Sequence, residues 1–322
     1  MPAEPWTDAP ILAIVTRSGF VEGHHRGAVV GLGSDGSMAL ARGPVSAPIF
    51  GRSTNKPLQA VAILRAGAEL DDEGVALACA SHSGEPVHLD GVRRMLAAVG
   101  LDEHALANTP TLPLNQEAQY AVLRAGGGPT ALAQNCSGKH AGMLAACVAA
   151  GWPTDSYLDP SHPLQRLVAD TIADLAGELV AAIGVDGCAA PVHAVSTIGL
   201  ARAFRRLATA DPTSPEGRVA TAMQKHPLLV GGTGRDVTRL MLEVPGLVAK
   251  DGAEGVYAAA LPDGRAVALK IDDGGGRART PVLVAALTAL GVDLSAVADL
   301  AFTPVLGGGR PVGAVRAVSL TD

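Results

Sequence analysis

Hydrophobic positions form short runs near both ends of the chain and recur with helical spacing in the middle. The short runs predict strands at 11–17, 26–32, 255–261, 266–271 and 311–320. Two of these runs are followed by residues typical of turns. Ser34-Asp35-Gly36 follows the run 26–32, and Pro262-Asp263-Gly264 follows the run 255–261. This pattern is typical of antiparallel hairpins with strands from both chain ends.

The middle of the chain carries apolar residues three and four positions apart, the period of an amphipathic helix. This spacing predicts helices at 58–65, 89–99, 142–150, 162–175, 198–207 and 282–290. Helices inserted between the two edges of one antiparallel sheet give an α+β architecture. We expect a single domain over residues 1–322, or two lobes that meet in the Pro-, Asp- and Ser-rich stretch 154–163.

Composition predicts an ordinary globular protein. The 322 residues are 48% hydrophobic and 17% charged, enough to form a full core. The net charge of -6 and the lack of a Lys/Arg-rich patch argue against nucleic acid and anionic membranes as partners. No apolar stretch reaches the roughly 18 residues of a membrane span, and residues 1–10 lack a basic signal-peptide region. We therefore expect a cytoplasmic protein with reduced cysteines.

Lysine is scarce, because only 5 of the 25 Lys+Arg residues are lysine. Arginine cannot release its proton, so a chain that uses arginine for charge keeps lysine where an amine is needed. Ser53-Thr54-Asn55-Lys56 places such an amine three residues after a hydroxyl, where a neutral lysine can take the serine proton. Pro57 disfavours helical geometry at Lys56, so we expect the pair on a turn that leads into a helix near Leu58. A solvated helix start is the alternative.

A second serine cluster follows the apolar run 75–80 and contains Ser81, His82, Ser83 and Glu85. Small residues at this element end leave room for a substrate. The alternative is a helix N-cap made by Ser83 or Ser81, with Glu85 in the first turn. The two interpretations are compatible, since helix N-termini also stabilise oxyanions.

Two further segments carry possible metal ligands, Asn135-Cys136-Ser137-Gly138-Lys139-His140 and Asp186-Gly187-Cys188. Two thiolates with two more donors satisfy a four-coordinate zinc ion. Deprotonating a lysine at pH 7 costs about 4 to 5 kcal/mol, so spacing alone favours His140 over Lys139. Buried cysteines beside a loop are the alternative.

Taken together, these segments resemble the class 3 (rhizobial-type) L-asparaginases of the asparaginase II family, over most of the chain. The blocks that carry the resemblance are 53–57, 79–85, 135–144 and 186–188. The resemblance implies a serine β-lactamase and glutaminase-like fold, a homodimer, and hydrolysis of L-asparagine to L-aspartate and ammonia. One departure is Asp236, which follows Gly234-Arg235 where some members carry a cysteine.

The resemblance also implies roles for single residues. It pairs Ser53 with Lys56 and Ser81 with Lys250 as the catalytic groups. It implies a zinc ion bound by Cys136, Lys139, Asp186 and Cys188, which favours Lys139 over His140. We expect the substrate to be bound by four residues of the same blocks, His82, Ser83, Glu85 and Asn135.

The leading hypothesis is covalent amide hydrolysis. Ser53 attacks the side-chain carboxamide, Lys56 takes its proton, and water cleaves the acyl-enzyme after ammonia has left, with Ser81 and Lys250 relaying protons. Glutamine differs by one methylene, worth only about 1 to 3 kcal/mol in a pocket, so glutaminase activity is an alternative. A β-lactamase-like acyl hydrolase is a weaker one, since Ser-Asp-Asn and Lys-Thr-Gly are missing. A zinc-stabilised amino-acid binding protein without turnover is the non-enzyme alternative.

Overall fold

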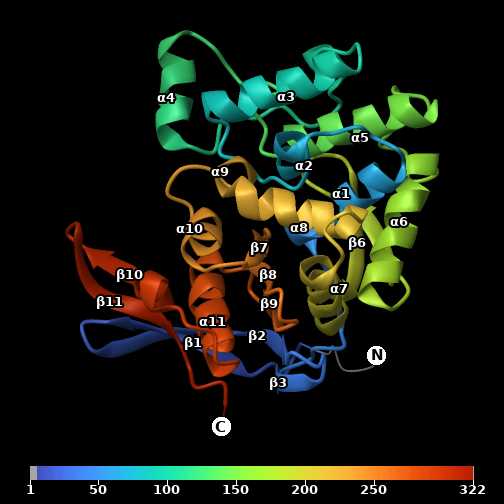
Figure 1. Cartoon of the computed structure of the whole chain (residues 1–322). Coiled ribbons are helices and arrows are strands. Elements are labelled where there is room, and N and C mark those ends of the chain that lie inside the picture. Colours follow the sequence, from blue (N-terminus) through green and yellow to red (C-terminus); the bar gives the residue numbers. More distant parts are fainter. Residues whose placement is uncertain (1–5, 322) are drawn as a thin grey trace.

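The protein combines a large antiparallel sheet with a layer of helices, as seen in a computed structural model that describes residues 6–321 (Figure 1). Within these residues eight strands form the main sheet in the order β10-β11-β1-β2-β9-β8-β7, with β3 also paired to β2. The predicted α+β class is confirmed. The strands are β1 Ile11–Arg17, β2 Phe20–Leu32, β3 Met38–Arg42, β7 Val248–Asp251, β8 Val256–Ala260, β9 Ala266–Ile271, β10 Phe302–Gly307 and β11 Arg310–Ala317.

The two chain ends meet in the main sheet, as predicted. Strand β1 pairs with β11, and Ala13 lies opposite Ala317. Three predicted strands match β1, β8 and β9 to within one residue at each end. Strand β2 begins at Phe20, six residues before the prediction, because its first half pairs with β1 in a hairpin whose exposed residues show no alternation. Strand β11 ends at Ala317, before the predicted Leu320.

A small second sheet supports the other side of the site. Its order is β4-β6-β5, with bounds Pro48–Phe50 for β4, Ala182–Val185 for β5 and Pro191–Ser196 for β6. All six residues of β6 are buried. This strand lies directly beside the turn that carries Ser53, since the Gly51 amide and the Asn55 side chain both donate to the His193 carbonyl.

The helices lie in the chain mainly between β3 and β7, which confirms the predicted insertion. They are α1 Lys56–Arg65, α2 Asp72–Ala78, α3 Pro86–Ala98, α4 Gln116–Arg124, α5 Ser137–Ala150, α6 Pro163–Ala176, α7 Thr197–Thr209, α8 Pro215–Lys225, α9 Pro227–Val230, α10 Asp236–Glu243 and α11 Gly276–Ala289. Three 3₁₀ turns in the described residues are η1 Arg52–Asn55, η2 Glu103–Ala105 and η3 Ser295–Ala301. Helices α7 and α11 pack on the main sheet against β2, β8 and β9.

Helix α1 is central, because nine of its ten residues are buried. A helix that is apolar around its whole circumference belongs inside a protein. Its neighbours are α2, α5, α6 and α8. Lys56 at its first position is therefore held in the core, and the charge of that lysine needs polar partners there.

Close packing between α2 and α5 brings their ends together. A Cβ on Gly138 would lie 2.3 Å from the Leu77 carbonyl oxygen, so only glycine permits this approach. Gly142 packs one turn later against Ala78 and Ile63. This contact places the start of α5 next to the loop that follows α2, and both contain predicted site residues.

The predicted helices are all present, with shifted ends. Helix α5 begins at Ser137, five residues before its predicted start, because Gly138, Lys139 and His140 interrupt the apolar pattern but continue the helix. The predicted lobe boundary 154–163 lies mostly in the loop between α5 and α6, and a division into lobes stays a prediction. No helix within residues 6–321 is both long enough and apolar enough to cross a membrane.

Candidate active site

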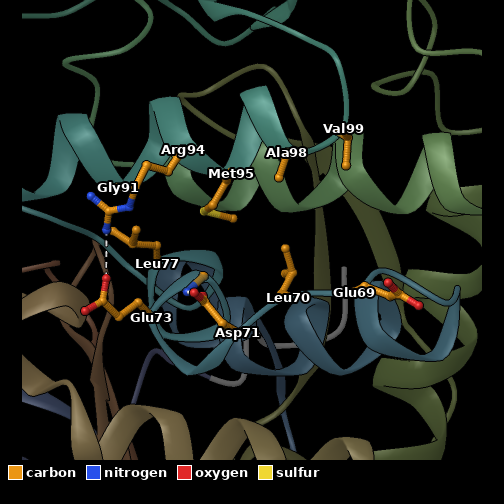
Figure 2. A pocket seen from close by; sticks show the side chains of 11 residues that line it. Glu69, Leu70, Asp71, Glu73, Leu77, Gly91, Arg94, Met95, Ala98 and Val99 are labelled. Carbon is orange, nitrogen blue, oxygen red and sulfur yellow. Dashed lines mark hydrogen bonds and ion pairs between the residues drawn. The ribbon is translucent and has the colours of Figure 1, made fainter.

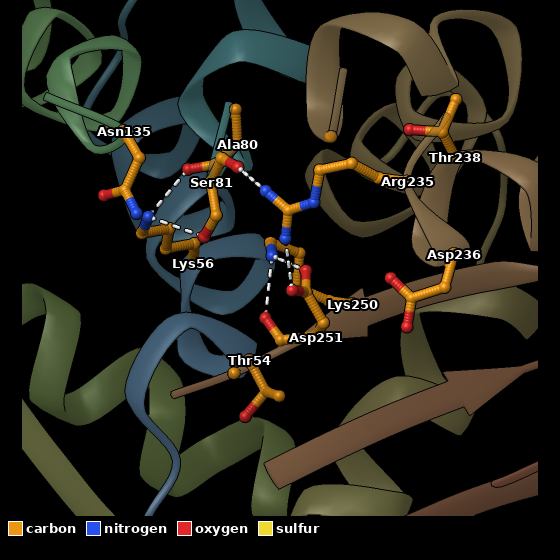
Figure 3. A network of polar contacts seen from close by, with 12 residues as sticks. Thr54, Lys56, Ala80, Ser81, Asn135, Arg235, Asp236, Thr238, Lys250 and Asp251 are labelled. Carbon is orange, nitrogen blue, oxygen red and sulfur yellow. Dashed lines mark hydrogen bonds and ion pairs between the residues drawn. The ribbon is translucent and has the colours of Figure 1, made fainter. Parts of the chain in front are cut away.

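Lys56 contacts Ser81 directly. The Lys56 Nζ atom donates hydrogen bonds to Ser81 Oγ at 2.9 Å and to the Ala80 carbonyl at 2.8 Å (Figure 3). Both side chains are buried, with 1% of Lys56 and 4% of Ser81 exposed. The resemblance pairs Lys56 with Ser53, whereas the hydrogen bond in the structure joins Lys56 to Ser81. The reason is the sharp turn after α2, which directs Ser81 towards the start of α1.

Ser53 lies one turn before Lys56, in the 3₁₀ turn η1, and is half-buried. Its carbonyl accepts the Lys56 backbone N–H, so the turn runs directly into α1. The expectation of a turn before the helix is confirmed. The expected effect of Pro57 is wrong, because Lys56 has helical angles of φ −62 and ψ −40. Pro57 stands in the first turn of α1, where its missing N–H needs no partner.

Lys250 is fully buried in β7 and bonds to Asp251. Its ammonium donates to the Asp251 carbonyl and to Asp251 Oδ1, each at 2.7 Å. Burial is the main cause that lowers the pKa of Lys250, to about 8, with Lys56 and Arg235 acting in the same direction against Asp251. The resemblance pairs Lys250 with Ser81, but the hydrogen bonds of Lys250 in the described structure go to Asp251.

Two arginines complete this network, and the sequence analysis missed them. Arg235 donates to the Ser81 carbonyl at 2.8 Å and to Asp251 Oδ2 at 2.5 Å. Arg279 donates to the same Oδ2 at 3.0 Å. Burial alone would raise the pKa of Asp251, but Lys250, Arg235 and Arg279 outweigh it and hold that pKa well below its ordinary range. The signal in the sequence was the position of Asp251 next to a scarce lysine.

Four predicted substrate-binding residues hold the surrounding loops together. His82 Nε2 donates to Ser137 Oγ at 2.8 Å while its Nδ1 accepts the Gly84 N–H, so the ring is neutral. Burial lowers the pKa of His82 well below its ordinary value, which agrees with a neutral ring. The remaining contacts are Ser83 Oγ to the Gly231 carbonyl at 3.0 Å and Cys136 Sγ to Asn135 Oδ1 at 3.0 Å.

Glu85 binds the loop that carries Arg235. Its carboxylate accepts the Thr233 N–H at 2.9 Å and the Thr233 hydroxyl at 2.7 Å. Glu85 is also the N-cap residue of α3. The alternative in which Ser81 or Ser83 caps this helix is therefore wrong, since both serines stand before the cap and bond elsewhere. Substrate binding by these four residues stays a prediction.

Three of the four predicted zinc ligands are close together. Lys139 Nζ donates to Cys188 Sγ at 3.1 Å, and Cys136 packs against Cys188. The neighbouring Cys136 thiol and Lys139 hold the pKa of Cys188 well below its ordinary range, and the contact with Cys188, together with burial, raises the pKa of Cys136. A thiolate beside an amine is a donor set that suits zinc.

Asp186, the fourth predicted ligand, is engaged elsewhere. Its Oδ1 accepts the Arg52 Nε–H at 2.8 Å and the Gly187 N–H at 2.8 Å. In agreement, no group of three or more His, Cys, Asp or Glu side chains is arranged to hold a metal ion in the described part of the chain. The residues fit a zinc ion in part, with both thiols and the amine of Lys139 in place.

Comparison with a protein-family model shows to which family the chain belongs. The model for L-asparaginase II matches residues 13–317, nearly the whole sequence. The chain belongs to this family. The family resemblance drawn from its motifs is therefore confirmed. No curated protein sequence matches it.

This asparaginase II chain is similar in fold to solved structures of low sequence identity. One is Mglu in its native form at 4.3 M NaCl, with 16% identity, a TM-score of 0.44, and 82% of this chain aligned to 60% of that one. This chain therefore spans less than two thirds of the length of Mglu. A second is a β-lactamase from Mycobacterium bovis, with 15% identity, a TM-score of 0.45, and coverages of 82% and 94%.

Two of the cavities that lie outside the polar network of this asparaginase II chain border α2 or the turn that carries Ser53. One of about 320 Å³ separates α2 from α3, and the Arg94–Glu73 ion pair of 2.7 Å spans it (Figure 2). The other, of about 310 Å³, borders Arg52, the residue before Ser53, and has Lys270 in its wall. Lys270 donates to the carbonyls of Glu254 and Ile271, so it stabilises this wall.

Proposed function

We propose that this protein hydrolyses the side-chain amide of L-asparagine to L-aspartate and ammonia through a serine ester. The observation that carries the proposal is the 2.9 Å hydrogen bond from Lys56 to Ser81. Lys56 stands one turn after Ser53, and the chain belongs to the asparaginase II family. Burial removes both groups from competing water, so that proton transfer between them is direct.

Ser53 is the serine that forms the ester in this proposal. It is half-buried, whereas Ser81 is 4% exposed, so a substrate arriving from solvent can reach Ser53 more readily. A neutral amine has two N–H bonds and one lone pair. Lys56 directs N–H bonds at the Ala80 carbonyl and Ser81 Oγ, which leaves the lone pair to accept the Ser53 proton.

The steps balance without any further reactant than water. Ser53 Oγ bonds to the amide carbon and its proton moves to Lys56. The carbon–nitrogen bond then breaks, and the nitrogen takes this proton, relayed by Ser81, to leave as ammonia. Water attacks the ester, gives one proton to Lys56, and Ser53 recovers that proton as L-aspartate departs.

Zinc is proposed as the cofactor. Cys136, Lys139 and Cys188 would hold the ion, and Asp186 would complete the set by exchanging its bond to Arg52 for one to the metal. With two thiolates the bound ion would be a weak Lewis acid for a carbonyl, so it would order the loops. Lys139, in the first turn of α5, would connect this centre to the loop of Ser81 through the packing of α5 on α2.

The test is ammonia release from L-asparagine by zinc-replete protein, compared with L-glutamine and a β-lactam. We expect turnover of L-asparagine, and an aspartyl ester on the peptide that contains Ser53 after acid quenching. Ser53→Ala should abolish both without changing the circular dichroism spectrum, while Ser319→Ala, at an exposed serine, should change neither. Ligand binding without ammonia would support the binding-protein alternative, and turnover of the β-lactam alone the acyl-hydrolase alternative.

A homodimer in the cytoplasm is proposed on the family resemblance. Light scattering on the eluting protein measures the mass of the assembly directly. A mass near twice 32.4 kDa supports the dimer.

A further inference from the structure

Asp251 is a counter-ion that three cations share. Its Oδ1 accepts from Lys250 and its Oδ2 accepts from Arg235 (Figure 3). The same Oδ2 also accepts from Arg279. Only 5% of its side chain is exposed. A buried carboxylate with this many charge-assisted bonds is fixed in place, because any movement would break several of them at once.

Arg235 connects this carboxylate to the serine loop. One guanidinium nitrogen donates to Asp251 and the other to the Ser81 carbonyl. The planar guanidinium fixes the relative orientation of its two acceptors more strictly than a lysine would. Arg235 and Ser81 are 154 positions apart in sequence. The Arg235 side chain therefore joins strand β7, which carries Asp251, to the Ser81 loop.

The charges around Lys250 act in opposite directions. Lys56 and Arg235 favour the neutral amine, as does complete burial, whereas Asp251 favours the ammonium. Arg279 acts on Lys250 through Asp251, to which both bond. Cys79, the remaining titratable neighbour, is buried and protonated, since burial raises its pKa. Arg235 and Asp251, which are bonded to each other, therefore act on the charge of Lys250 in opposite directions.

We infer that Asp251 and Arg235 are positioning residues of the reaction, which fix Lys250 relative to Ser81 and set in opposite directions how readily Lys250 holds its proton. The inference rests on the proposed function, because it concerns Lys250, which the family resemblance pairs with Ser81 as a proton relay. Neither residue touches the reacting atoms in this assignment. Each acts through another group, Asp251 through its hydrogen bond from Lys250 and Arg235 through the Ser81 backbone.

Two substitutions that each remove one charge should therefore shift the titration of Lys250 in opposite directions. Asp251→Asn removes the charge that favours the ammonium, so Lys250 should lose its proton at lower pH, by about 1 pH unit. Arg235→Gln removes a cation that favours the neutral amine, so Lys250 should lose its proton at higher pH by a similar amount. A purely structural role would give both variants the same sign.

The experiment uses the scarcity of lysine. Protein labelled with ¹³C at lysine Cε gives five signals, and Lys250→Arg identifies the one of interest. Its titration is followed without substrate in the wild type, Asp251→Asn and Arg235→Gln, and the pH profile of kcat/KM for L-asparagine is measured in parallel. Asp263→Asn and Arg265→Gln, at a 2.7 Å ion pair outside the network, are the matched controls.

Opposite shifts of the titration, with the acid limb of kcat/KM moving in the same two directions, support the inference. Arg235→Lys should restore the wild-type midpoint, since it keeps the charge. The inference is overturned if the two variants shift the Lys250 titration in the same direction or do not shift it. It is also overturned if the acid limb of kcat/KM does not move with that titration. Because Arg235→Gln leaves Asp251 bonded to Lys250 and Arg279, that variant decides the matter where Asp251→Asn does not fold. An absence of ammonia from the wild type would instead overturn the proposed function, independently of the titration.

Discussion

The Nζ atom of Lys56 lies 2.9 Å from the hydroxyl of Ser81, a residue 25 positions further along the chain. This contact connects the first turn of α1 with the loop after α2, and it gives the proposed base two serine neighbours, Ser53 by sequence and Ser81 by contact. The two serines therefore have separable roles, which substitution of each can distinguish.

Ser81→Ala should lower kcat by about 10² to 10⁴-fold, the usual contribution of a positioned proton relay, with a small change in KM. The ester on Ser53 should still form, because the nucleophile and Lys56 remain. Rapid quenching followed by peptide mass analysis measures the ester, and steady-state ammonia release measures kcat. An ester found on Ser81 in the wild type, or lost in Ser81→Ala alone, would reverse the assignment of the two serines.

The zinc ligands should differ in strength. Cys188→Ser should remove most of the bound zinc, because Cys188 contacts both Lys139 and Cys136. Asp186→Asn should retain much of it, since Asp186 bonds to Arg52 in the structure. Metal content per chain, measured by mass spectrometry after dialysis, gives the comparison.

Cys147→Ala is the control for the zinc experiment, because Cys147 is a buried free thiol outside the cluster. It should keep the zinc content of the wild type. Chelation of zinc should raise KM for asparagine more than it lowers kcat. A loss of kcat at saturating substrate, with the fold intact, would argue for a direct chemical role of the metal.

Sequence alone identified the elements whose pattern is local. The strand Ile11–Arg17 and the strand Ala266–Ile271 were predicted in full. The start of α5 was missed, because Gly138 is a poor helix former and Lys139 interrupts the apolar pattern, whereas close packing of Gly138 against Leu77 favours the helix.

Contacts between distant segments could not be predicted in the same way. Arg235 was noticed only as a neighbour of Asp236, and nothing in its spacing shows that it bonds to Ser81 and Asp251. The hydrogen bond from Lys56 to Ser81 depends on the turn after α2, which spacing along the chain does not show. Charge networks depend on which loops meet, and a single sequence does not record this.

Glu85→Ala should loosen the loop that carries Arg235. The carboxylate accepts two hydrogen bonds from Thr233, and bonds to a charged group contribute about 1.5 to 3 kcal/mol each. The backbone amide of Thr233 should therefore exchange at least about 10-fold faster with deuterium, and KM for asparagine should rise. Glu22→Ala, at a surface ion pair, is the control. A higher KM with unchanged exchange would mean that Glu85 binds the substrate itself.

Lys250→Met should make the protein inactive but more stable at pH 7. The pKa of Lys250 is lowered from 10.5 to about 8, chiefly by burial, so its charged form costs the fold about 3 kcal/mol. Between pH 8 and 10.5 the unfolded chain binds this proton and the folded one does not, so stability rises with pH in that window. Below pH 8 the full cost is present.

The substitution removes that cost while Asp251 keeps Arg235 and Arg279 as partners. Urea unfolding at pH 7 and pH 10 should therefore show a gain for Lys250→Met at pH 7 that shrinks towards pH 10. Lys225→Met, at the exposed ion pair with Asp72, should change stability by less than about 1 kcal/mol and without this trend. A variant that is less stable than the wild type at pH 7 would show that the bond to Asp251 outweighs the burial of the charge. The sign of this one difference thus decides whether the buried lysine is retained for activity at the expense of stability.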